Sequence, residues 1–466
     1  MSSSKKSTGK QLQDKLTFSF PSIAMKDPDR VREAFAFCEP YKAFLNNAKT
    51  ERECVSEAVR QLEEAGYQVF DPAAGYKAGD KVYMNNRGKA VIAATFGKKP
   101  LTEGIRMNAA HIDCPRLDLK PTPLYEKNDI AYFKTHYYGG IRKYQWATIP
   151  LSLHGVVYKK NGDAVTIRIG DDPEDPVFYI SDLLPHLAAT QNTRKLGEGI
   201  KGEELNIVVG ALPYPDEDIK EPVKLMALSL MHDKYGITEA DFYRAELELV
   251  AAGTARDVGF DRSLIAATGH DDRVCAYPAL RAEIDTKKPA HTTVTVLTDK
   301  EEIGSVGNTG LNSDYVRHFI EYLAENAGVN YKDVVKNSLC LSSDVSAAFD
   351  PTFPDVYEPG NSCYLGKGCV LTKYTGARGK SGSSDASAET MYKVIHTMEK
   401  AGVYWQAGEL GKVDEGGGGT VAQFVAHLNI DVVDLGVPVM SMHAPMEIVS
   451  KLDVYEAYQA FKAFYK

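Results

Sequence analysis

The chain has 466 residues, of which 44% are hydrophobic and 25% are charged, as in globular proteins of two or three domains. Its formal net charge of −9 argues against nucleic acid or an anionic membrane as a partner, and no apolar run approaches the ~20 residues of a membrane span. The start, MSSSKKSTGK, lacks the apolar core of a secretory signal. The seven cysteines form no CxxC pair, which is typical of a reduced, cytoplasmic protein and directs the search for a metal site to His, Asp and Glu.

The order of elements along the chain predicts an α/β fold. The stretch 49–67, KTERECVSEAVRQLEEAGY, has Thr50 as N-cap and Glu53 three residues later, which is the capping-box pattern of a helix start. After it, apolar strand-like runs alternate with amphipathic helical stretches. The strand-like runs are KAVIAATFG, IRMNAAHID, TTVTVLTD, NSLCLSSD and VPVMSMH, and the helical stretches include VRHFIEYLAENAG and SAETMYKVIHTMEKAG. Such alternation predicts helices around a mixed or parallel sheet.

The middle of the chain has a different pattern. It contains short strand-like runs such as LSLHGVVYKK and NGDAVTIRIG, several prolines, and a turn signal at Asn161-Gly162. We therefore expect a β-rich domain of residues 121–253, inserted into a first domain that consists of residues 1–120 and 254–466.

One motif resembles a phosphate-binding loop but does not meet its requirements. Gly379-Lys380-Ser381 matches the end of that motif, yet the motif needs a glycine five positions before Gly379, where this chain has Tyr374. The sequence therefore gives little support to a nucleotide site.

Five polar clusters follow apolar runs, the position at which α/β folds build their sites. They are His111-Ile112-Asp113, Asp271-Asp272, Glu301-Glu302, Ser343-Asp344 and Met442-His443. Each cluster alone is more often a solvated loop, a helix N-cap or an ordinary strand-end histidine than a metal ligand. Together they offer two histidines, several carboxylates and no thiol, a set that suits a pair of divalent ions, most naturally zinc.

The adjacent glutamates Glu301 and Glu302 fit the needs of such a site. Two ions need a bridging carboxylate, and hydrolysis needs a further carboxylate that takes the proton of the attacking water. Neighbouring glutamates at a strand end can divide these tasks, one facing the metal and the other the water. In an extended segment His111 and Asp113 face the same side, so that the carboxylate can fix the tautomer of the imidazole.

The motifs HIDCPRLDLK, GHDDRVCAYPAL, DKEEIGSVGNTG, SSD and MHAPMEI resemble, in order and across nearly the whole chain, the aspartyl aminopeptidase family of dinuclear zinc exopeptidases. ELELVAAGTARDVGFDRSLI and GGGGTVA are similar to the bacterial branch of that family. The resemblance implies a mixed-sheet zinc-exopeptidase catalytic domain, with the β-rich insertion as an oligomerisation domain. It also implies homo-oligomers, by family resemblance dodecamers, that enclose the active sites.

The resemblance also assigns roles to individual residues. One zinc ion would be held by His111, Asp271 and Asp344, and the other by Glu302 and His443, with Asp271 as the bridge. Glu301 would be the general base, and Asp113 would orient His111. Within the insertion, LLPHLAATQ matches the segment whose histidine reaches the site of a neighbouring subunit, and that histidine is His186 here.

The chain departs from the family at one place. Aspartyl aminopeptidases usually carry histidines three and six residues after the aspartate that matches Asp344, and here those positions are Ala347 and Asp350. An additional carboxylate such as Asp350 near the substrate would repel an acidic side chain. A cation for an acidic side chain or the peptide carbonyl would then come from Lys373, Arg378 or Lys380, so the preferred N-terminal residue stays open.

The function predicted from the sequence is therefore that of a cytoplasmic metalloaminopeptidase acting on peptides with a free N-terminus. It would use two Zn ions per subunit, with Co or Mn as substitutes. The same ligand set also serves carboxypeptidases and deacylases, which are the alternative. A non-catalytic assembly protein on the same scaffold is a further alternative.

Overall fold

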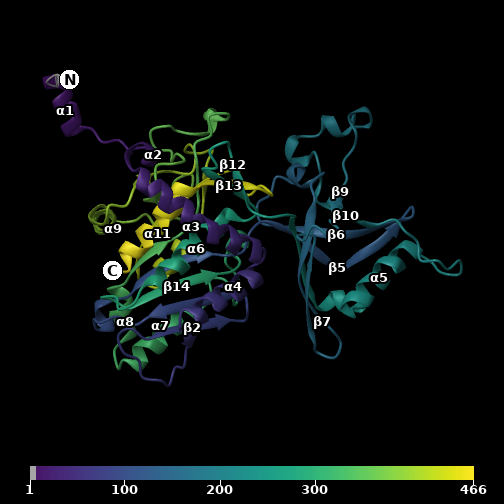
Figure 1. Ribbon diagram of the computed structural model, residues 1–466, viewed down its shortest axis with the longest axis horizontal. Coiled ribbons are helices and arrows are strands. Elements are labelled where there is room, and N and C mark those ends of the chain that lie inside the picture. Colours follow the sequence, from purple (N-terminus) through teal and green to yellow (C-terminus); the bar gives the residue numbers. More distant parts are fainter. Residues whose placement is uncertain (1–6) are drawn as a thin grey trace.

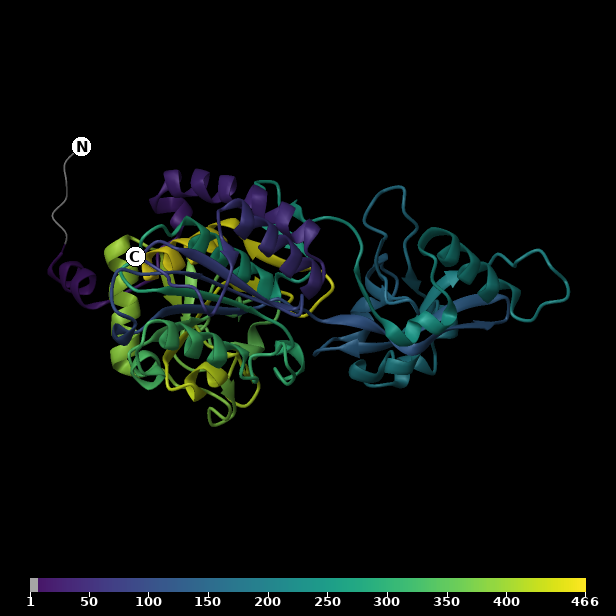
Figure 2. The same cartoon turned by 90° about the horizontal axis from the view of Figure 1, so that it is seen from below.

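The structure, a computed structural model, describes residues 7–466 as a large α/β body from which a smaller β-rich body projects (Figure 1, Figure 2). The N-terminal helices α1 (Thr8–Leu16) and α2 (Ile23–Lys26) precede the large body, and α1 extends away from it. Within residues 7–466, no helix combines the length and the apolar character needed to cross a membrane.

The large body is built on a nine-stranded mixed sheet with the order β1-β2-β3-β14-β4-β15-β21-β17-β19. At its centre, β14, β4, β15 and β21 are parallel neighbours. β14 is buried along its whole length, as its apolar sequence TVTVLT requires of a strand covered on both faces. The strands are β1 (Gln68–Val69), β2 (Lys81–Asn86), β3 (Ala90–Thr95), β4 (Arg106–His111), β14 (Thr293–Thr298), β15 (Leu339–Ser342), β17 (Cys369–Thr372), β19 (Trp405–Ala407) and β21 (Asp431–Gly436).

Helices cover both faces of this sheet. One hydrophobic core joins the first face to α3, α4, α6, α9 and α11, and a second core joins the other face to α7, α8 and α10. The helices are α3 (Pro28–Asn47), α4 (Glu51–Glu64), α6 (His270–Asp285), α7 (Tyr315–Asn326), α8 (Tyr331–Lys336), α9 (Ala388–Ala401), α10 (Ala422–His427) and α11 (Lys451–Phe464). α4 begins with the predicted capping box of Thr50 and Glu53. The predicted mixed α/β fold is confirmed.

Two smaller sheets complete the large body. A five-stranded sheet has the order β12-β13-β23-β22-β16, and a two-stranded sheet joins β18 to β20. These strands are β12 (Arg256–Val258), β13 (Leu264–Ala267), β16 (Ser346–Ala347), β18 (Gly376–Ala377), β20 (Gly417–Gly418), β22 (Pro438–Met440) and β23 (Glu447–Ser450).

The β-rich body is a seven-stranded antiparallel sheet with the order β8-β7-β11-β5-β6-β10-β9 and a hydrophobic core of its own around Trp146 and Phe133. Its elements are β5 (Arg116–Lys127), β6 (Ile130–Tyr138), β7 (Leu151–Tyr158), β8 (Ala164–Ile169), β9 (Tyr179–Ile180), β10 (Asn206–Gly210), α5 (Pro222–Tyr235) and β11 (Ala245–Ala251). The division of the chain at residues 120/121 and 253/254 stays a prediction. β5 runs across the first of these positions.

Candidate metal centre

The polar clusters that the sequence singles out meet at one edge of the nine-stranded sheet. β14, β4 and β15 are parallel neighbours, so their carboxyl ends lie together at this edge. His111 is the last residue of β4, and Asp344 follows β15. Glu301 and Glu302 lie in the 3-10 turn η8 (Glu301–Ile303), which comes directly after β14.

Asp271 lies at the centre of this group. It stands in the first turn of α6, where the backbone departs from helical geometry (φ −79°, ψ 107°) and the side chain faces the sheet edge. Its Oδ1 atom is 3.1 Å from His111 Nε2, and its Oδ2 atom is 3.2 Å from His443 Nε2. His443 comes from the loop between β22 and β23, so one carboxylate spans two histidines from distant parts of the sequence.

Three further carboxylates surround the two imidazoles. Glu301 Oε2 lies 4.0 Å and Asp344 Oδ1 lies 3.8 Å from His111 Nε2. Glu302 Oε1 lies 3.6 Å from His443 Nε2. Among the residues that the structure describes, two sets have potential ligand atoms within 4.8 Å of one another: His111 with Glu301 and Asp344, and His111 with Asp271 and Glu302.

The tautomers of both histidines follow from their backbone contacts. His111 Nδ1 is 3.0 Å from the carbonyl oxygen of Asp113, and His443 Nδ1 is 2.8 Å from the carbonyl oxygen of Gly140. Because a carbonyl oxygen only accepts, each Nδ1 carries a hydrogen, which leaves Nε2 as the nitrogen through which each ring can bind a metal. Both Nε2 atoms therefore face carboxylate oxygens of Asp271, an arrangement that a cation between them stabilises.

The burial of the carboxylates points to the same ligand. Asp271 Oδ1 and Glu302 Oε1 are buried without a hydrogen-bond donor. Burial raises the pKa of Glu301 to about 8, and it raises the pKa of Glu302 and of Asp344 above the usual range. Ionised carboxylates are stable in a buried place when they coordinate a metal. Two histidines and four carboxylates, without a thiol, fit zinc.

Asp113 is fully buried behind His111 and holds the glutamate turn as well as the histidine. Its Oδ1 atom accepts a hydrogen bond from the backbone N–H of Glu301 at 3.1 Å and lies 3.4 Å from His111 Nδ1. Its Oδ2 atom accepts from the backbone N–H of Glu302 at 3.2 Å and from the hydroxyl of Tyr138 at 2.8 Å. The position of both glutamates therefore depends on Asp113.

Glu447, the first residue of β23, was not among the predicted site residues. It is buried, and its Oε2 atom accepts from the backbone N–H of Asp271 at 3.0 Å. Its Oε1 atom accepts from the backbone N–H of His443 at 2.7 Å, so Glu447 braces both residues. Burial raises its pKa to about 8. The available signal was a charged residue at the start of the apolar run EIVS, four positions after His443.

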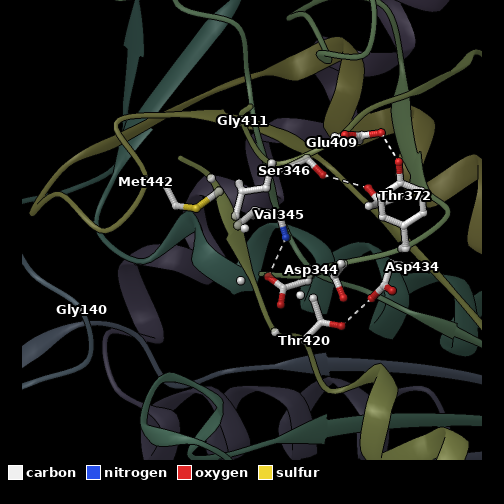
Figure 3. A pocket seen from close by; sticks show the side chains of 18 of the residues that line it. Gly140, Asp344, Val345, Ser346, Thr372, Glu409, Gly411, Thr420, Asp434 and Met442 are labelled. Carbon is white, nitrogen blue, oxygen red and sulfur yellow. Dashed lines mark hydrogen bonds between the residues drawn. The ribbon is translucent and has the colours of Figure 1, made fainter. Parts of the chain in front are cut away.

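The metal centre opens into a cavity of about 430 Å³ (Figure 3). Asp434 lines it and accepts a hydrogen bond from the Thr420 hydroxyl at 2.7 Å. A glycine stretch, Gly416–Gly419, forms part of its wall and pairs with β18 through β20. A Cβ atom at Gly416 would lie 1.9 Å from the carbonyl oxygen of Leu410, and one at Gly417 would lie 2.3 Å from that of Gly376, so this part of the wall is bare backbone.

The residues predicted to bind substrate are only partly at this cavity. Arg378 and Lys380 line it. Among the described residues, Lys373 and Asp350 do not. Lys373 forms an ion pair of 2.7 Å with Asp385 instead, and the Asp350 carboxylate accepts a hydrogen bond from the Thr352 backbone N–H at 2.8 Å.

His186 is also separate from the metal centre of its own chain. It lies exposed in the 3-10 turn η3 (Pro185–Leu187) of the β-rich body and is not among the described residues that line the cavity. Its predicted role concerns a neighbouring subunit and stays a prediction.

The model of the family described as aminopeptidase I zinc metalloprotease (M18) matches residues 44–465. The chain belongs to this M18 family. A probable M18 family aminopeptidase 1 of Clostridium acetobutylicum is 48% identical over 446 residues, which cover 94% of this chain and 96% of that relative. The resemblance to aspartyl aminopeptidases is confirmed, and the protein is an aminopeptidase of this zinc metalloprotease family.

Solved structures of the M18 family share the fold. The M18 aminopeptidase of Thermotoga maritima superposes with a TM-score of 0.91 at 43% identity, over 97% of this chain and all of that chain. The yeast mApe1 dodecamer superposes with a TM-score of 0.75 at 20% identity, over 92% of this chain and 96% of that chain, which shows a common fold.

Proposed function

We propose that this aminopeptidase hydrolyses the first peptide bond of substrates with a free N-terminus, using two zinc ions that Asp271 bridges. The observation that carries this proposal is the contact of the two Asp271 oxygens with the Nε2 atoms of two different histidines, at 3.1 and 3.2 Å. A carboxylate in this position can hold two ions side by side, as a two-metal hydrolytic site requires.

The surrounding residues divide between the two ions. His111 and Asp344 would hold one ion together with Asp271, and Glu302 and His443 would hold the other. When bound there, zinc polarises a carbonyl oxygen and lowers the pKa of water, and cobalt or manganese can take the same ligands. The carbonyl oxygens of Asp113 and Gly140 hold the two imidazoles with their Nε2 atoms toward Asp271, the orientation that metal binding would require.

Glu301 is proposed to be the general base. Its carboxylate takes a proton from the attacking water and returns it to the leaving amine. The hydrogen bond from its backbone N–H to Asp113 fixes the turn that carries this carboxylate. Glu301 Oε2 also lies 4.0 Å from His111 Nε2, so the metal content of a Glu301 variant is needed to distinguish a general base from a metal ligand.

The cavity is proposed to hold the first side chain of the peptide, while the charged α-amine lies near the carboxylates of the metal centre. Arg378 and Lys412 line the cavity and, among residues 7–466, form no ion pair. They are available to an acidic side chain, whereas the predicted contribution of Lys373 and Asp350 to substrate binding stays a prediction. Initial rates on aminoacyl substrates with Asp, Glu, Leu, Lys and Ala will give the order of preference.

We further propose a homo-oligomer, by the family resemblance a dodecamer, in the cytoplasm. Exposed Leu183, Leu184 and Leu187 surround His186 on the β-rich body and offer an apolar surface to another subunit. All seven cysteines are unpaired and buried, which agrees with a reducing compartment. Light scattering will give the subunit number, and a complementation assay that mixes H186A with a metal-site variant will test whether His186 acts in a neighbouring site.

The decisive test of the proposed function combines metal analysis with blocked substrates. We expect two zinc ions per chain, chelator-sensitive cleavage of peptides with a free N-terminus, and no cleavage once the α-amine is acetylated. Cleavage of acetylated substrates would instead support a deacylase, and release of the C-terminal residue would support a carboxypeptidase. Fewer than one ion per chain after addition of zinc, with no turnover, would support a non-catalytic assembly protein.

A further inference from the structure

The end of β6 brings the β-rich body into contact with the metal centre of its own chain. The segment concerned is Tyr138-Gly139-Gly140, the last residue of the strand and the two that follow, of which Gly140 is labelled in Figure 3. It contacts residues on both sides of Asp271: the Tyr138 hydroxyl donates to Asp113, and the Gly140 carbonyl accepts from His443. The predicted site contains none of these three residues.

Two contacts fix Tyr138: its hydroxyl donates a hydrogen bond to Asp113, and its ring packs against Arg116. Its phenol oxygen lies 2.8 Å from Asp113 Oδ2, and the ring packs under the Arg116 guanidinium, 3.9 Å from the ring centre. Arg116 is itself buried and fixed by ion pairs with Glu51 at 3.1 Å and Glu248 at 3.3 Å. Burial and the Asp113 charge raise the pKa of Tyr138 well above its usual value, so the hydroxyl remains a donor.

The two glycines bring the backbone close to the proposed metal ligands. Gly139 has φ +75°, and a Cβ atom there would lie 3.0 Å from Glu302 Oε2. A Cβ atom at Gly140 would lie 3.3 Å from His443 Nδ1. The segment therefore packs directly against the carboxylate and the imidazole, with no space for a side chain that would separate them.

We propose that Tyr138 is a positioning residue of the metal centre, and that the Tyr138–Gly140 segment of the β-rich body sets the affinity for zinc. The proposal rests on the dinuclear site proposed above. The Tyr138 hydroxyl fixes the Asp113 carboxylate, which orients His111 and holds the backbone of Glu301 and Glu302. The Gly140 carbonyl fixes the tautomer of His443. The β-rich body is thus part of the active site, in addition to any role in assembly.

The first experiment compares Tyr138→Phe with Tyr137→Phe in the full-length protein. Phe keeps the ring that Arg116 covers and removes only the hydroxyl, whereas Tyr137 is the neighbouring strand residue with an exposed side chain. Zinc affinity is measured by competition with a chelator on stripped protein, and kcat and KM are measured after zinc is restored. Y138F is expected to bind zinc ~10–100-fold more weakly and to lose kcat with little change in KM, while Y137F matches the wild type.

A second pair of variants tests the backbone contact without altering the tyrosine. Gly139→Ala places a methyl group against Glu302, whereas Gly162→Ala places one at a glycine of the same body that also has positive φ (+92°) but nothing within 4 Å. Both variants carry the backbone strain of a positive φ, so only a loss of zinc affinity specific to G139A reports the contact. We expect that loss to be at least tenfold relative to G162A.

The outcomes separate this proposal from the proposed function. If the wild type holds two zinc ions but Y138F and G139A bind zinc as tightly as their controls, the positioning role is overturned and the dinuclear site stands. A fall in thermal stability of Y138F with unchanged zinc affinity and unchanged kcat would show a merely structural tyrosine and would also overturn it. A wild type that binds no second ion removes the dinuclear site, and the proposal falls with it.

Discussion

The two histidines of the metal centre have different surroundings. His111 ends a central strand, its side chain is 1% exposed, and it is braced by Asp113 two residues further along the chain. His443 lies in a loop with φ +62°, its side chain is 33% exposed, and it is braced by Gly140 from the other body. One half of the centre is therefore built into the sheet, and the other is assembled from loops of two bodies. We expect the two halves to hold metal with different affinities.

The largest effect is expected where both halves meet. Asp271→Asn replaces the carboxylate that faces both Nε2 atoms, so both ions should be lost and turnover should fall by more than the ~10²–10⁴-fold that removal of a general base costs. Metal analysis and kcat/KM check this. If the Asp271→Asn variant keeps one tightly bound ion, the His111 half binds its ion without the bridging carboxylate.

Glu301→Gln should leave both halves intact and remove the chemistry. The amide cannot accept the proton of water, so kcat should fall by ~10²–10⁴-fold while the zinc content stays at the wild-type level. Parallel metal analysis and kinetics test this expectation. A fall in zinc content would instead make Glu301 a ligand beside His111 and Asp344, as their mutual distances allow.

The contrast between the halves is tested directly by His443→Ala and His111→Ala. H443A should keep one ion, because His111, Asp271 and Asp344 remain in a buried place, whereas H111A should weaken both positions. In the wild type, titration with chelator should release the first ion at a concentration ~10–100-fold lower than the second, by analogy with the effect of outer contacts on metal affinity. Simultaneous release of both ions would remove the distinction.

The smallest effect concerns stability at the junction of the two bodies. Burial alone would raise the pKa of Glu51, but Arg116 at 3.1 Å and Lys89 at 3.0 Å hold it at about 2. A carboxylate with a lowered pKa in the folded state stabilises the protein above its unfolded pKa, and this stabilisation is lost as the pH falls through the folded pKa. Glu51→Gln should therefore cost on the order of 3 kcal/mol at pH 7 and much less near pH 2.

The control for this variant is Glu64→Gln, which removes an exposed partner of Arg60 on the same helix and should change little. Thermal or urea unfolding across the pH range provides the measurement. An equal loss of stability for E51Q at both ends of the range would show that the ion pairs do not set the pKa of Glu51.

Much of the fold and of the candidate site follows from local sequence patterns. The all-apolar run TVTVLT is buried as β14, and the polar residues that follow such runs meet because parallel strands end at the same edge. Asp271 shows a limit of this reasoning, since its position before an apolar helix suggests an N-cap while the backbone there turns its carboxylate toward two histidines.

Other contacts depend on tertiary packing that no local pattern contains. The sequence around Tyr138 predicts an ordinary strand residue. Its contact with Asp113 exists only because β6 ends against the large body. Glu447 stands out in the sequence only as a charged residue at the start of an apolar run, and its hydrogen bonds to the backbone of Asp271 and His443 arise from the tertiary fold. The charge of Lys373 predicts a contact with substrate, and the sequence alone does not reveal its ion pair with Asp385.

The glycine wall of the cavity limits how substrate preference can diverge among descendants of this sequence. No side chain can be introduced at Gly416 or Gly417 without moving the opposing backbone, so we expect single substitutions at these two positions to be rejected. Divergence is left to neighbours that already carry side chains, such as Tyr374, Arg378 and Lys380. In a lineage whose substrate preference changes, we therefore expect substitutions in the segment 374–380, while Gly416 and Gly417 stay unchanged.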